Sequence, residues 1–363
     1  MKGLELSGYG DPAAVVKLVD VPDLSSPEPD EVIIEVEAFP VDPTDLYVIA
    51  GVYGELPRLP HLLGCEGVGR VVATGREVRR VKEGDRTLVP PFSNAWAELV
   101  RTKASWLRPL PDGDVDQRSL LGINPPTAAL LLSEFVSLKA GDWVVQTAAN
   151  SAVGRSLIPI AKARGLRTIN IVRRPELVAE LERLGGDVVL VDGPDLAGRI
   201  AAATDRAPLA LALDGVGGGA TQRLLDAMPI YGVLVVWSAM SGDPVALSGP
   251  LMVFEGRSVH GFWIVNWLKR PGNWERFGAI CEELAPMIAS GEISMPIAGV
   301  YGLDQHTEAL SVASNYRGKA IFRRNGVMRT PGPDKAPFTR SRGPPNARAG
   351  LQIANPKRKS TCK

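Results

Sequence analysis

The middle of the chain alternates short, wholly apolar segments with helical patterns, and this alternation constrains the fold more than any other feature. The segments expected to be strands are 143–147, 167–172, 188–191, 209–213 and 233–236, with a sixth at 258–263. Helices are expected at 152–164 and 175–184. Strands that are apolar on both faces need helices on both sides, so the pattern predicts a parallel, doubly wound α/β sheet.

The segments on either side of this region have a different character. Residues 1–110 contain short strand patterns, such as 31–38 and 67–75, between many prolines, and no long helical period. A helix is expected again at 274–289, followed by a short last strand at 320–322. The sequence therefore predicts a mostly-β domain formed by 1–132 with 274–324, and a nucleotide-binding domain at 133–273.

The last segment, 325–363, is predicted to be a disordered basic tail. It holds nine Lys or Arg residues, one acid and six prolines, and it shows no apolar periodicity. Such a composition buries too little surface to offset the entropy of ordering the chain. Two interpretations stay open: a solvated tail without a role, and a basic arm that is densest at 356–359.

The charge of the whole chain excludes several partner classes. Lys and Arg number 41 against 40 Asp and Glu, a formal net charge of +1, so neither nucleic acid nor an anionic membrane is expected as a partner. No run of 18 apolar residues occurs, and the first residues lack the apolar core of a signal peptide. We therefore expect a cytoplasmic protein.

The turn after the first central strand has the residues of a dinucleotide site. It reads Ala149-x-Ser151-x-x-Gly154, with small residues where a tight turn, a pyrophosphate and close packing of helix on strand require them. The helix that follows would offer N–H groups and a favourable dipole to phosphate. Taken alone, such a turn is also compatible with packing, and Pro159 is expected to kink the helix.

The end of the second central strand indicates which dinucleotide binds. An NAD site has Asp or Glu there, whereas this strand ends in Arg173-Arg174. Two guanidinium groups attract a 2′-phosphate and accept nothing from a free 2′-hydroxyl. NADPH is therefore predicted, and a solvated arginine pair is the alternative.

The cysteines and histidines argue against a metal. There are three of each, and only His61 and Cys65 lie close together in the sequence. No C-x-x-C or H-E-x-x-H occurs, so a disulfide framework and a structural zinc site are not expected.

Several segments resemble the medium-chain dehydrogenase/reductase superfamily. The segment Gly64-Cys65-Glu66-Gly67 corresponds to its Gly-His-Glu-Gly signature, with Cys65 where zinc members have His, and the stretch 43–45 lacks their earlier Cys. The resemblance therefore implies a zinc-free member. It also implies a GroES-like mostly-β catalytic domain and a Rossmann domain.

Within this branch the chain resembles the mitochondrial-type 2-enoyl thioester reductases of fatty-acid synthesis. The segments that carry this resemblance are 51–60, 121–128, 146–154 with 166–170, 213–218 and 261–263. It runs from about residue 1 to 322. The chain departs from the family at Arg173-Arg174, at Pro159 and at 237–240.

The resemblance implies a reaction and a set of residues. The reaction is NADPH-dependent reduction of trans-2-enoyl thioesters of CoA or acyl carrier protein, with Tyr53 as the catalytic residue and Tyr47 as the alternative donor. It further implies a homodimer. The residues implied to bind the cofactor are Asn124, Asn150, Ser151, Ala152, Val153, Arg173, Arg174, Trp237, Ser238, Ala239, Met240, Phe262, Trp263, Ile264, Val265 and Lys319.

Two other functions remain open. One is a zinc-independent NADPH:quinone oxidoreductase of the same superfamily, which differs in its acceptor. The other is a nucleotide-sensing regulatory protein without enzymatic activity, with the basic tail as its partner-binding part. The segment around Tyr53 favours the enoyl reductase over both.

Overall fold

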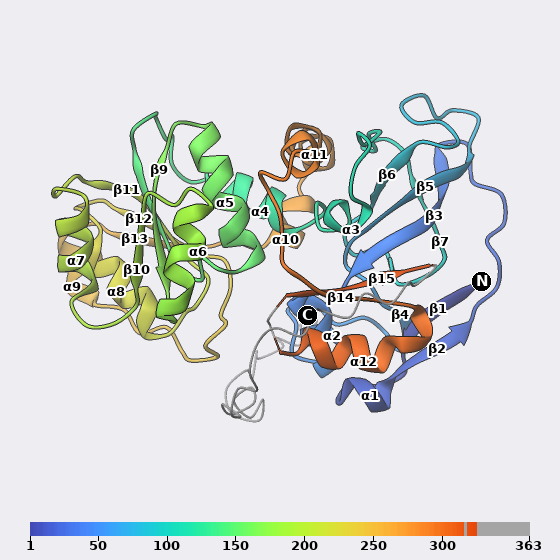
Figure 1. Ribbon diagram of the computed structural model, residues 1–363, viewed down its shortest axis with the longest axis horizontal. Helices are drawn as coiled ribbons and strands as arrows, with labels where there is room; N and C mark the ends of the chain where they lie inside the picture. The colour runs from blue at the N-terminus through green and yellow to red at the C-terminus, as the bar shows by residue number, and fades with distance from the viewer. Residues whose placement is uncertain (316–317, 325–363) are drawn as a thin grey trace, which may run out of the picture.

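The six central strands pair into one parallel sheet, as predicted. The computed structural model describes residues 1–315 and 318–324, and the predicted tail lies outside them. The sheet has the order β10-β9-β8-β11-β12-β13 (Figure 1). Its strands are β8 (Trp143–Gln146), β9 (Arg167–Val172), β10 (Val188–Val191), β11 (Leu209–Asp214), β12 (Val233–Val236) and β13 (Ser258–Gly261). The helices between them are α5 (Ala152–Ala163), α6 (Val178–Arg183), α7 (Leu196–Ala203), α8 (Gly219–Ala227) and α9 (Gly249–Phe254).

The other half of the molecule is built on two further sheets. One has the order β14-β15-β3-β5-β6, with β7 also on β3, and the smaller one has the order β2-β1-β4. Their strands are β1 (Lys2–Leu6), β2 (Val16–Asp20), β3 (Glu31–Pro40), β4 (His61–Leu62), β5 (Gly67–Thr74), β6 (Arg86–Val89), β7 (Leu99–Lys103), β14 (Ile297–Tyr301) and β15 (Lys319–Arg323). The helices outside the parallel sheet are α1 (Pro12–Val15), α2 (Pro43–Ala50), α3 (Val115–Arg118), α4 (Asn124–Leu131), α10 (Ile264–Leu268), α11 (Asn273–Ala289) and α12 (His306–Ala313), with short 3-10 turns η1 (Pro175–Leu177) and η2 (Leu303–Gln305).

The end of the described chain returns to its beginning through the pair β3 and β15. They run antiparallel, with Phe322 opposite Phe39 and Ile321 opposite Pro40. Aromatic packing supports the pair: the rings of Phe39 and Phe322 lie 5.1 Å apart, and Trp96 packs on both. This return closes the mostly-β half from two segments that are distant in the sequence.

Three local features differ from the sequence-based expectations. The helix expected at 175–184 begins as the 3-10 turn η1 and becomes α-helical only at Val178. The helix α5 continues through Pro159, which is buried among apolar neighbours that offset the lost backbone hydrogen bond. The helix α2 was not predicted, although Asp42-Pro43 and an acid at Asp45 form a helix-start signal.

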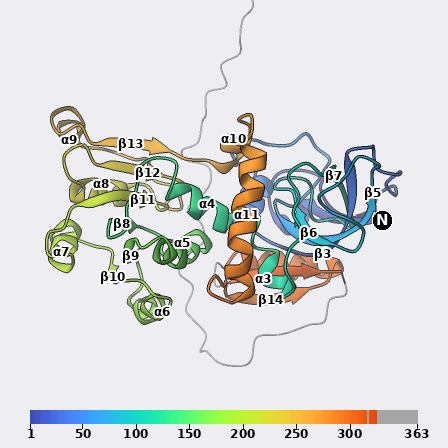
Figure 2. The ribbon, with the colours of Figure 1, turned by 90° about the horizontal axis from the view of Figure 1, so that it is seen from above.

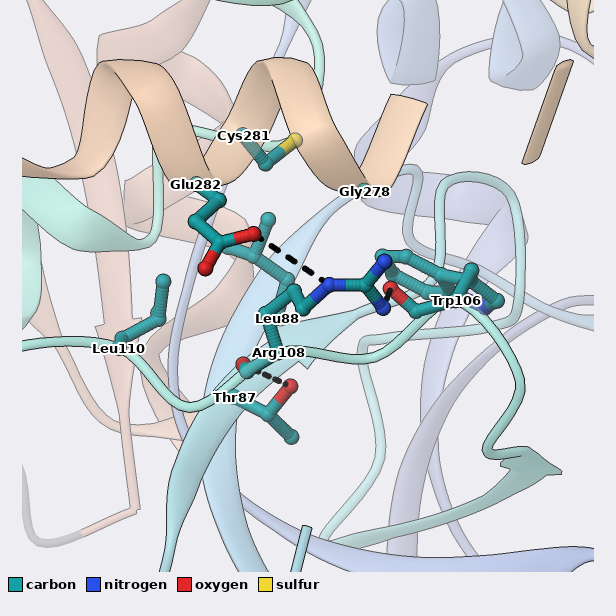
Figure 3. A pocket seen from close by; sticks show the side chains of 8 residues that line it. All are labelled: Thr87, Leu88, Trp106, Arg108, Leu110, Gly278, Cys281 and Glu282. Atoms are coloured by element: carbon teal, nitrogen blue, oxygen red, sulfur yellow. Dashed lines mark hydrogen bonds and ion pairs between the residues drawn. The ribbon is translucent and has the colours of Figure 1, made fainter. Parts of the chain in front are cut away.

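The long helix α11 lies between the two halves (Figure 2). Its Glu275 binds Arg108 of the mostly-β half at 2.6 Å, and its Glu283 lies 3.5 Å from Arg164 of the other half. A hollow of about 10 Å³ beneath α11 is closed by the ion pair of Arg108 and Glu282 (Figure 3). That volume holds about one water molecule, so it is a packing defect rather than a binding site.

None of the helices in the described residues combines the length and the apolar character that crossing a membrane requires.

Candidate functional site

A cavity of about 240 Å³ lies next to the segment that follows α2. It has an apolar rim and a polar floor, and it is lined from both halves of the molecule. The lining residues are Thr44, Asp45, Val48, Tyr53, Glu55, Leu56, Pro57, His61, Leu63, Gly64, Cys65, Phe92, Asn94, Trp263 and Val265. Tyr53 and Trp263, predicted for catalysis and for the cofactor, therefore share one cavity.

Tyr53 is held at this cavity by an aromatic partner from the other half. The indole Nε1 of Trp263 donates a hydrogen bond to the Tyr53 hydroxyl at 2.7 Å, and the two rings meet edge to face at 5.5 Å. The hydroxyl of Thr44 also hydrogen-bonds to Tyr53. Burial raises the pKa of Tyr53 to about 12. The phenol therefore keeps its proton at neutral pH and can donate it, whereas Tyr47 on α2 does not line the cavity.

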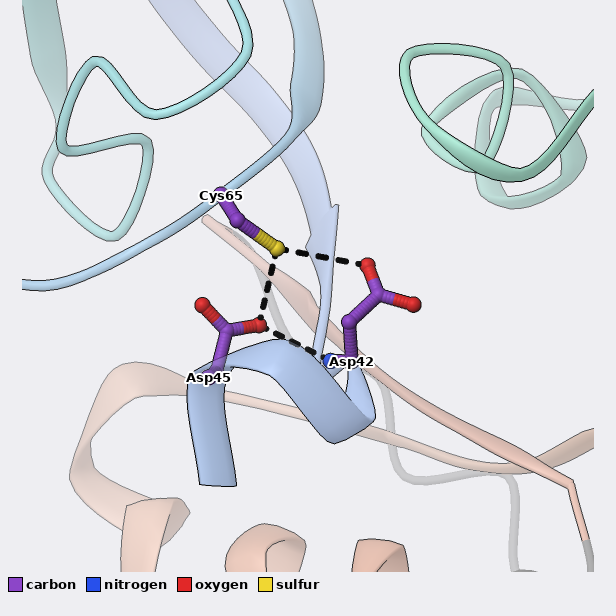
Figure 4. A group of neighbouring side chains, drawn as sticks. All are labelled: Asp42, Asp45 and Cys65. Carbon is purple, nitrogen blue, oxygen red and sulfur yellow. Dashed lines mark hydrogen bonds between the residues drawn. The ribbon is translucent and has the colours of Figure 1, made fainter. Parts of the chain in front are cut away.

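The floor of the cavity contains an acid and a thiol. Cys65 Sγ lies 3.2 Å from Asp45 Oδ2 and 3.5 Å from Asp42 Oδ2, and all three residues are buried (Figure 4). Burial, together with the charge of Asp42, raises the pKa of Asp45 to about 7. Burial likewise raises the pKa of the Cys65 thiol well above its ordinary value, so the thiol keeps its proton and can donate it.

Behind this floor, Lys319 forms an ion pair with Asp42. Burial is the largest influence and acts to raise the pKa of Asp42, but the charge of Lys319 together with hydrogen bonds from Glu66, Lys319 and Asn124 holds this pKa below its ordinary value. Burial and the charge of Asp42 raise the pKa of the nearby Glu66 well above its usual range. Asn124 bridges the group, because its amide donates to Asp42 at 3.3 Å and to Glu66 at 3.4 Å.

These contacts place two predicted cofactor residues in a buried charged cluster. Lys319 and Asn124 both have carboxylate partners there, in addition to any role toward a nucleotide. Sequence reasoning missed Asp42, Asp45 and Glu66. Two signals could have drawn attention to the aspartates: the helix-start pattern around Pro43, and the stretch 43–45 where zinc members of the family have a Cys ligand.

The predicted dinucleotide turn is tight, capped and closely packed. Ser151 caps α5 by accepting a hydrogen bond from the Gly154 N–H at 3.1 Å, and Ala148 has a positive φ of 50°. A Cβ at Gly154 would lie 2.7 Å from the backbone of Ala148 and Ala149, so only glycine allows this close packing. Asn150, Ala152 and Val153 complete the turn and the start of the helix. These residues fit a dinucleotide, whose phosphates the N-terminus of α5 would hold.

The other predicted nucleotide residues follow the same ends of the parallel strands. Arg173 and Arg174 follow β9 and are exposed. Among the described residues, the only ion pair that either arginine forms is that of Arg174 with Glu176, at 3.8 Å. The nearby Asp192 is neutralised by Arg223 at 2.5 Å. The remaining residues follow β12 (Trp237, Ser238, Ala239, Met240) and β13 (Phe262, Trp263, Ile264, Val265). Of these groups, only Trp263 and Val265 reach the cavity of Tyr53.

Two family models match this chain. Residues 28–112 match an alcohol dehydrogenase GroES-like domain, and residues 152–282 match a family described as zinc-binding dehydrogenase. The first lies in the mostly-β half and the second covers most of the parallel sheet. The predicted pair of a GroES-like and a Rossmann-type domain is therefore confirmed.

Curated relatives match nearly the whole chain. A mitochondrial enoyl-[acyl-carrier-protein] reductase of Caenorhabditis elegans is 35% identical over 88% of this chain and 94% of the relative. The protein of the same name from Mus musculus is 35% identical over 86% of this chain and 85% of the relative.

Solved structures with the same fold include enzymes of two kinds. A mutant enoyl thioester reductase from Candida tropicalis aligns with a TM-score of 0.77 at 23% identity, over 89% of this chain and 99% of that one. A quinone oxidoreductase from Pseudomonas syringae aligns with a TM-score of 0.75 at 28% identity, over 89% and 99%. A mycobacterial protein complexed with NADPH aligns with a TM-score of 0.76 at 26% identity, over 89% and 100%.

The pKa of Asp45 makes stability depend on pH. The ordinary pKa of an aspartate, 3.8, applies to the unfolded chain, and the folded protein has a pKa of about 7. Between these two pH values the folded protein keeps a proton that the unfolded chain releases. Stability from this group is therefore lost as the pH rises through that window. We expect Asp45→Asn, which cannot ionise, to gain about 2–3 kcal/mol relative to the original protein between about pH 5 and about pH 8.

Urea unfolding at the two pH values measures this difference. Asp226→Asn, which removes an exposed carboxylate on α8, is the control and should show no such gain. An equal free-energy difference between the Asp45 variant and the original protein at both pH values would contradict the assignment.

Proposed function

Because this chain belongs to the medium-chain dehydrogenase/reductase superfamily and, within it, to the family of the mitochondrial enoyl-[acyl-carrier-protein] reductases, we propose that it reduces trans-2-enoyl thioesters with NADPH. The acyl carrier in this proposal is CoA or acyl carrier protein, and the reaction belongs to fatty-acid synthesis. The nucleotide when bound supplies a hydride for C3 of the acyl chain.

One observation carries the proposal: the Tyr53 hydroxyl faces a cavity beside the dinucleotide half while Trp263 fixes its position. Reduction of an enoyl thioester places negative charge on the thioester oxygen and requires a proton at C2. A hydroxyl with a pKa of about 12 holds the proton that both steps use. Trp263 donates to the Tyr53 oxygen, so this hydrogen bond does not use the O–H hydrogen that a substrate would accept.

The arginines after β9 support NADPH as the cofactor. Arg173 and Arg174 are exposed at the edge where a nucleotide ribose would lie, and the nearby acids Asp192 and Glu176 are ion-paired with Arg223 and Arg174. The 2′-phosphate would therefore meet two guanidinium groups and no free carboxylate. The turn 148–154 would hold the pyrophosphate.

A quinone is the second candidate acceptor, because a quinone oxidoreductase is among the proteins of the same fold. Both activities use the same nucleotide edge, and they differ in what Tyr53 must do. A quinone accepts hydride without an enolate and needs no proton at carbon. Turnover of crotonyl, hexenoyl and decenoyl thioesters beside a quinone panel separates the two.

We propose that the chain forms a homodimer through the outer edge of the parallel sheet. β13 is the last strand of that sheet, and the large apolar side chains next to it are the most exposed of the described chain: Ile230, Tyr231, Val253 and Phe254, with exposed fractions of 61%, 79%, 75% and 83%. Figure 2 shows β13 along one side of the parallel-sheet half and α9 at the end of the molecule away from the mostly-β half. A second copy placed there would cover the apolar groups and the open strand edge.

Two further points stay proposals. The domain limits of 1–132 with 274–324, and of 133–273, agree with the sheets, and limited proteolysis tests them. The relatives above are named mitochondrial, and cell fractionation would test whether this chain is cytoplasmic instead.

Tyr53→Phe tests the catalytic role. The variant keeps the ring and removes the donor, so kcat with an enoyl thioester should fall by about 10²-fold or more. The affinity for NADPH should hardly change, and the lost hydrogen bond from Trp263 should cost about 1 kcal/mol of stability. Steady-state kinetics and thermal unfolding measure both effects. Tyr47→Phe is the matched control, and near-original turnover of the Tyr53 variant would remove this hydroxyl from the mechanism.

Arg173→Ala/Arg174→Ala tests the cofactor. Each arginine lost removes a charge-assisted contact to the 2′-phosphate, so KM for NADPH should rise by about 10²-fold while KM for NADH changes little. Arg183→Ala, an exposed arginine on the neighbouring α6, is the control. Equal use of NADH and NADPH by the original protein would show that the arginines do not select the cofactor.

Val253→Asp/Phe254→Glu tests the dimer. Four added charges in one symmetric interface should weaken association by about 10²-fold or more, and light scattering should report a monomer. Val72→Lys, at an exposed position of β5, should leave the dimer intact. A monomeric original protein would overturn the proposed interface.

A further inference from the structure

The family description of residues 152–282 implies zinc, and the structure brings together side chains that could bind a divalent ion. Cys65 Sγ, Asp42 Oδ2 and Asp45 Oδ2 lie within 4.8 Å of one another (Figure 4). Their separations of 3.2 and 3.5 Å from the sulfur are close to the value of about 3.5 Å between sulfur and oxygen ligands of one zinc ion. Glu66, wholly buried beside Asp42, has an Oε2 atom without a hydrogen-bond partner.

A cation already occupies this cluster. Lys319 Nζ is ion-paired with Asp42 Oδ1, and the lysine side chain is only 11% exposed. The Asn124 amide donates to the same carboxylate, and the backbone N–H of Asp42 donates to Asp45 Oδ2 at 2.8 Å. A divalent ion in the cluster would lie a few ångströms from the ammonium group, inside a buried site where charges repel strongly. The present residues therefore do not fit zinc.

Strand pairing places the backbone of Lys319 beside Asp42. In the β3–β15 ladder, Ile321 lies opposite Pro40, and the Val41 N–H donates to Ala320 O at 2.9 Å. The same register places Lys319 opposite Asp42. Strand pairing thus brings the Lys319 backbone beside Asp42, and the lysine side chain reaches the carboxylate from there.

We propose that Lys319 takes the place of a divalent metal ion in this cluster and is the one group that prevents Asp42, Asp45 and Cys65 from binding one. Replacing it by a neutral side chain of similar length removes the repulsion and leaves the ligands in place. Cobalt or zinc then displaces the Cys65 thiol proton to solvent and binds one thiolate and two carboxylates, with Glu66 beside them. The proposal does not depend on the substrate of the enzyme.

Lys319→Met in the full chain tests this with cobalt as the probe. After treatment with a chelator, under reducing and oxygen-free conditions, the original protein should retain cobalt only far below one ion per chain. The variant should bind roughly one, with the near-ultraviolet absorption of a cobalt–thiolate bond, and cobalt should raise its Tm. Lys319→Met/Cys65→Ser should lose the thiolate absorption. Lys103→Met, which removes an exposed lysine paired with Asp30, should bind none.

Two results would overturn the proposal. One is Cys65-dependent, stoichiometric cobalt in the original protein, since the lysine would then not exclude the metal. The other is a folded Lys319→Met variant that takes up no cobalt. If that variant does not fold alone, refolding it with cobalt should restore the native circular dichroism, because the metal supplies the missing positive charge. Failure of cobalt to restore it also counts against the proposal. A rise in the Kd for NADPH without metal uptake would assign Lys319 to the cofactor instead.

Discussion

The antiparallel pairing of β3 with β15 is the constraint on which both the mostly-β half and the charged cluster depend. It pairs residues 38–40 with residues 321–323, which lie near opposite ends of the described chain. A shift of one residue would turn Phe322 away from Phe39 and Trp96. It would also move Lys319 from Asp42 and leave a buried carboxylate without its cation. Packing and electrostatics therefore select the same register.

Two buried aspartates illustrate different ways of stabilising a charge. Asp214, at the end of β11, accepts hydrogen bonds from the hydroxyls of Thr147 and Thr221 and from the backbone of Gly217. Neutral donors suffice there, and the site is structural. Asp42 instead depends on an ammonium group, and burial together with the charge of Asp42 raises the pKa of the neighbouring acids Asp45 and Glu66. With a single cation available, Asp45 keeps its proton up to about pH 7.

The proposed catalytic geometry arises where the two halves meet. Tyr53 follows α2 in the mostly-β half, and Trp263 follows the last strand of the parallel sheet. Their hydrogen bond and a second bridge, the ion pair of Glu55 with Lys269, hold the tyrosine segment against the dinucleotide half. A Cβ at position 54 would lie 3.2 Å from the Trp263 ring, so a residue larger than Gly54 would push the two segments apart. Position of the hydroxyl is therefore a property of the interface between the halves.

The sequence by itself determined the central sheet and the dinucleotide turn. Strand patterns that are apolar on both faces can only be buried between helices, and small residues at 149–154 are required by close backbone contacts. Resemblance supplied Tyr53. Only the tertiary structure decided that Trp263, expected beside the cofactor, bonds to Tyr53, and that Lys319 is paired with Asp42. Local patterns record which face of an element is buried. They hold no information on which distant side chain will share that burial, because register and the contact between domains set those distances.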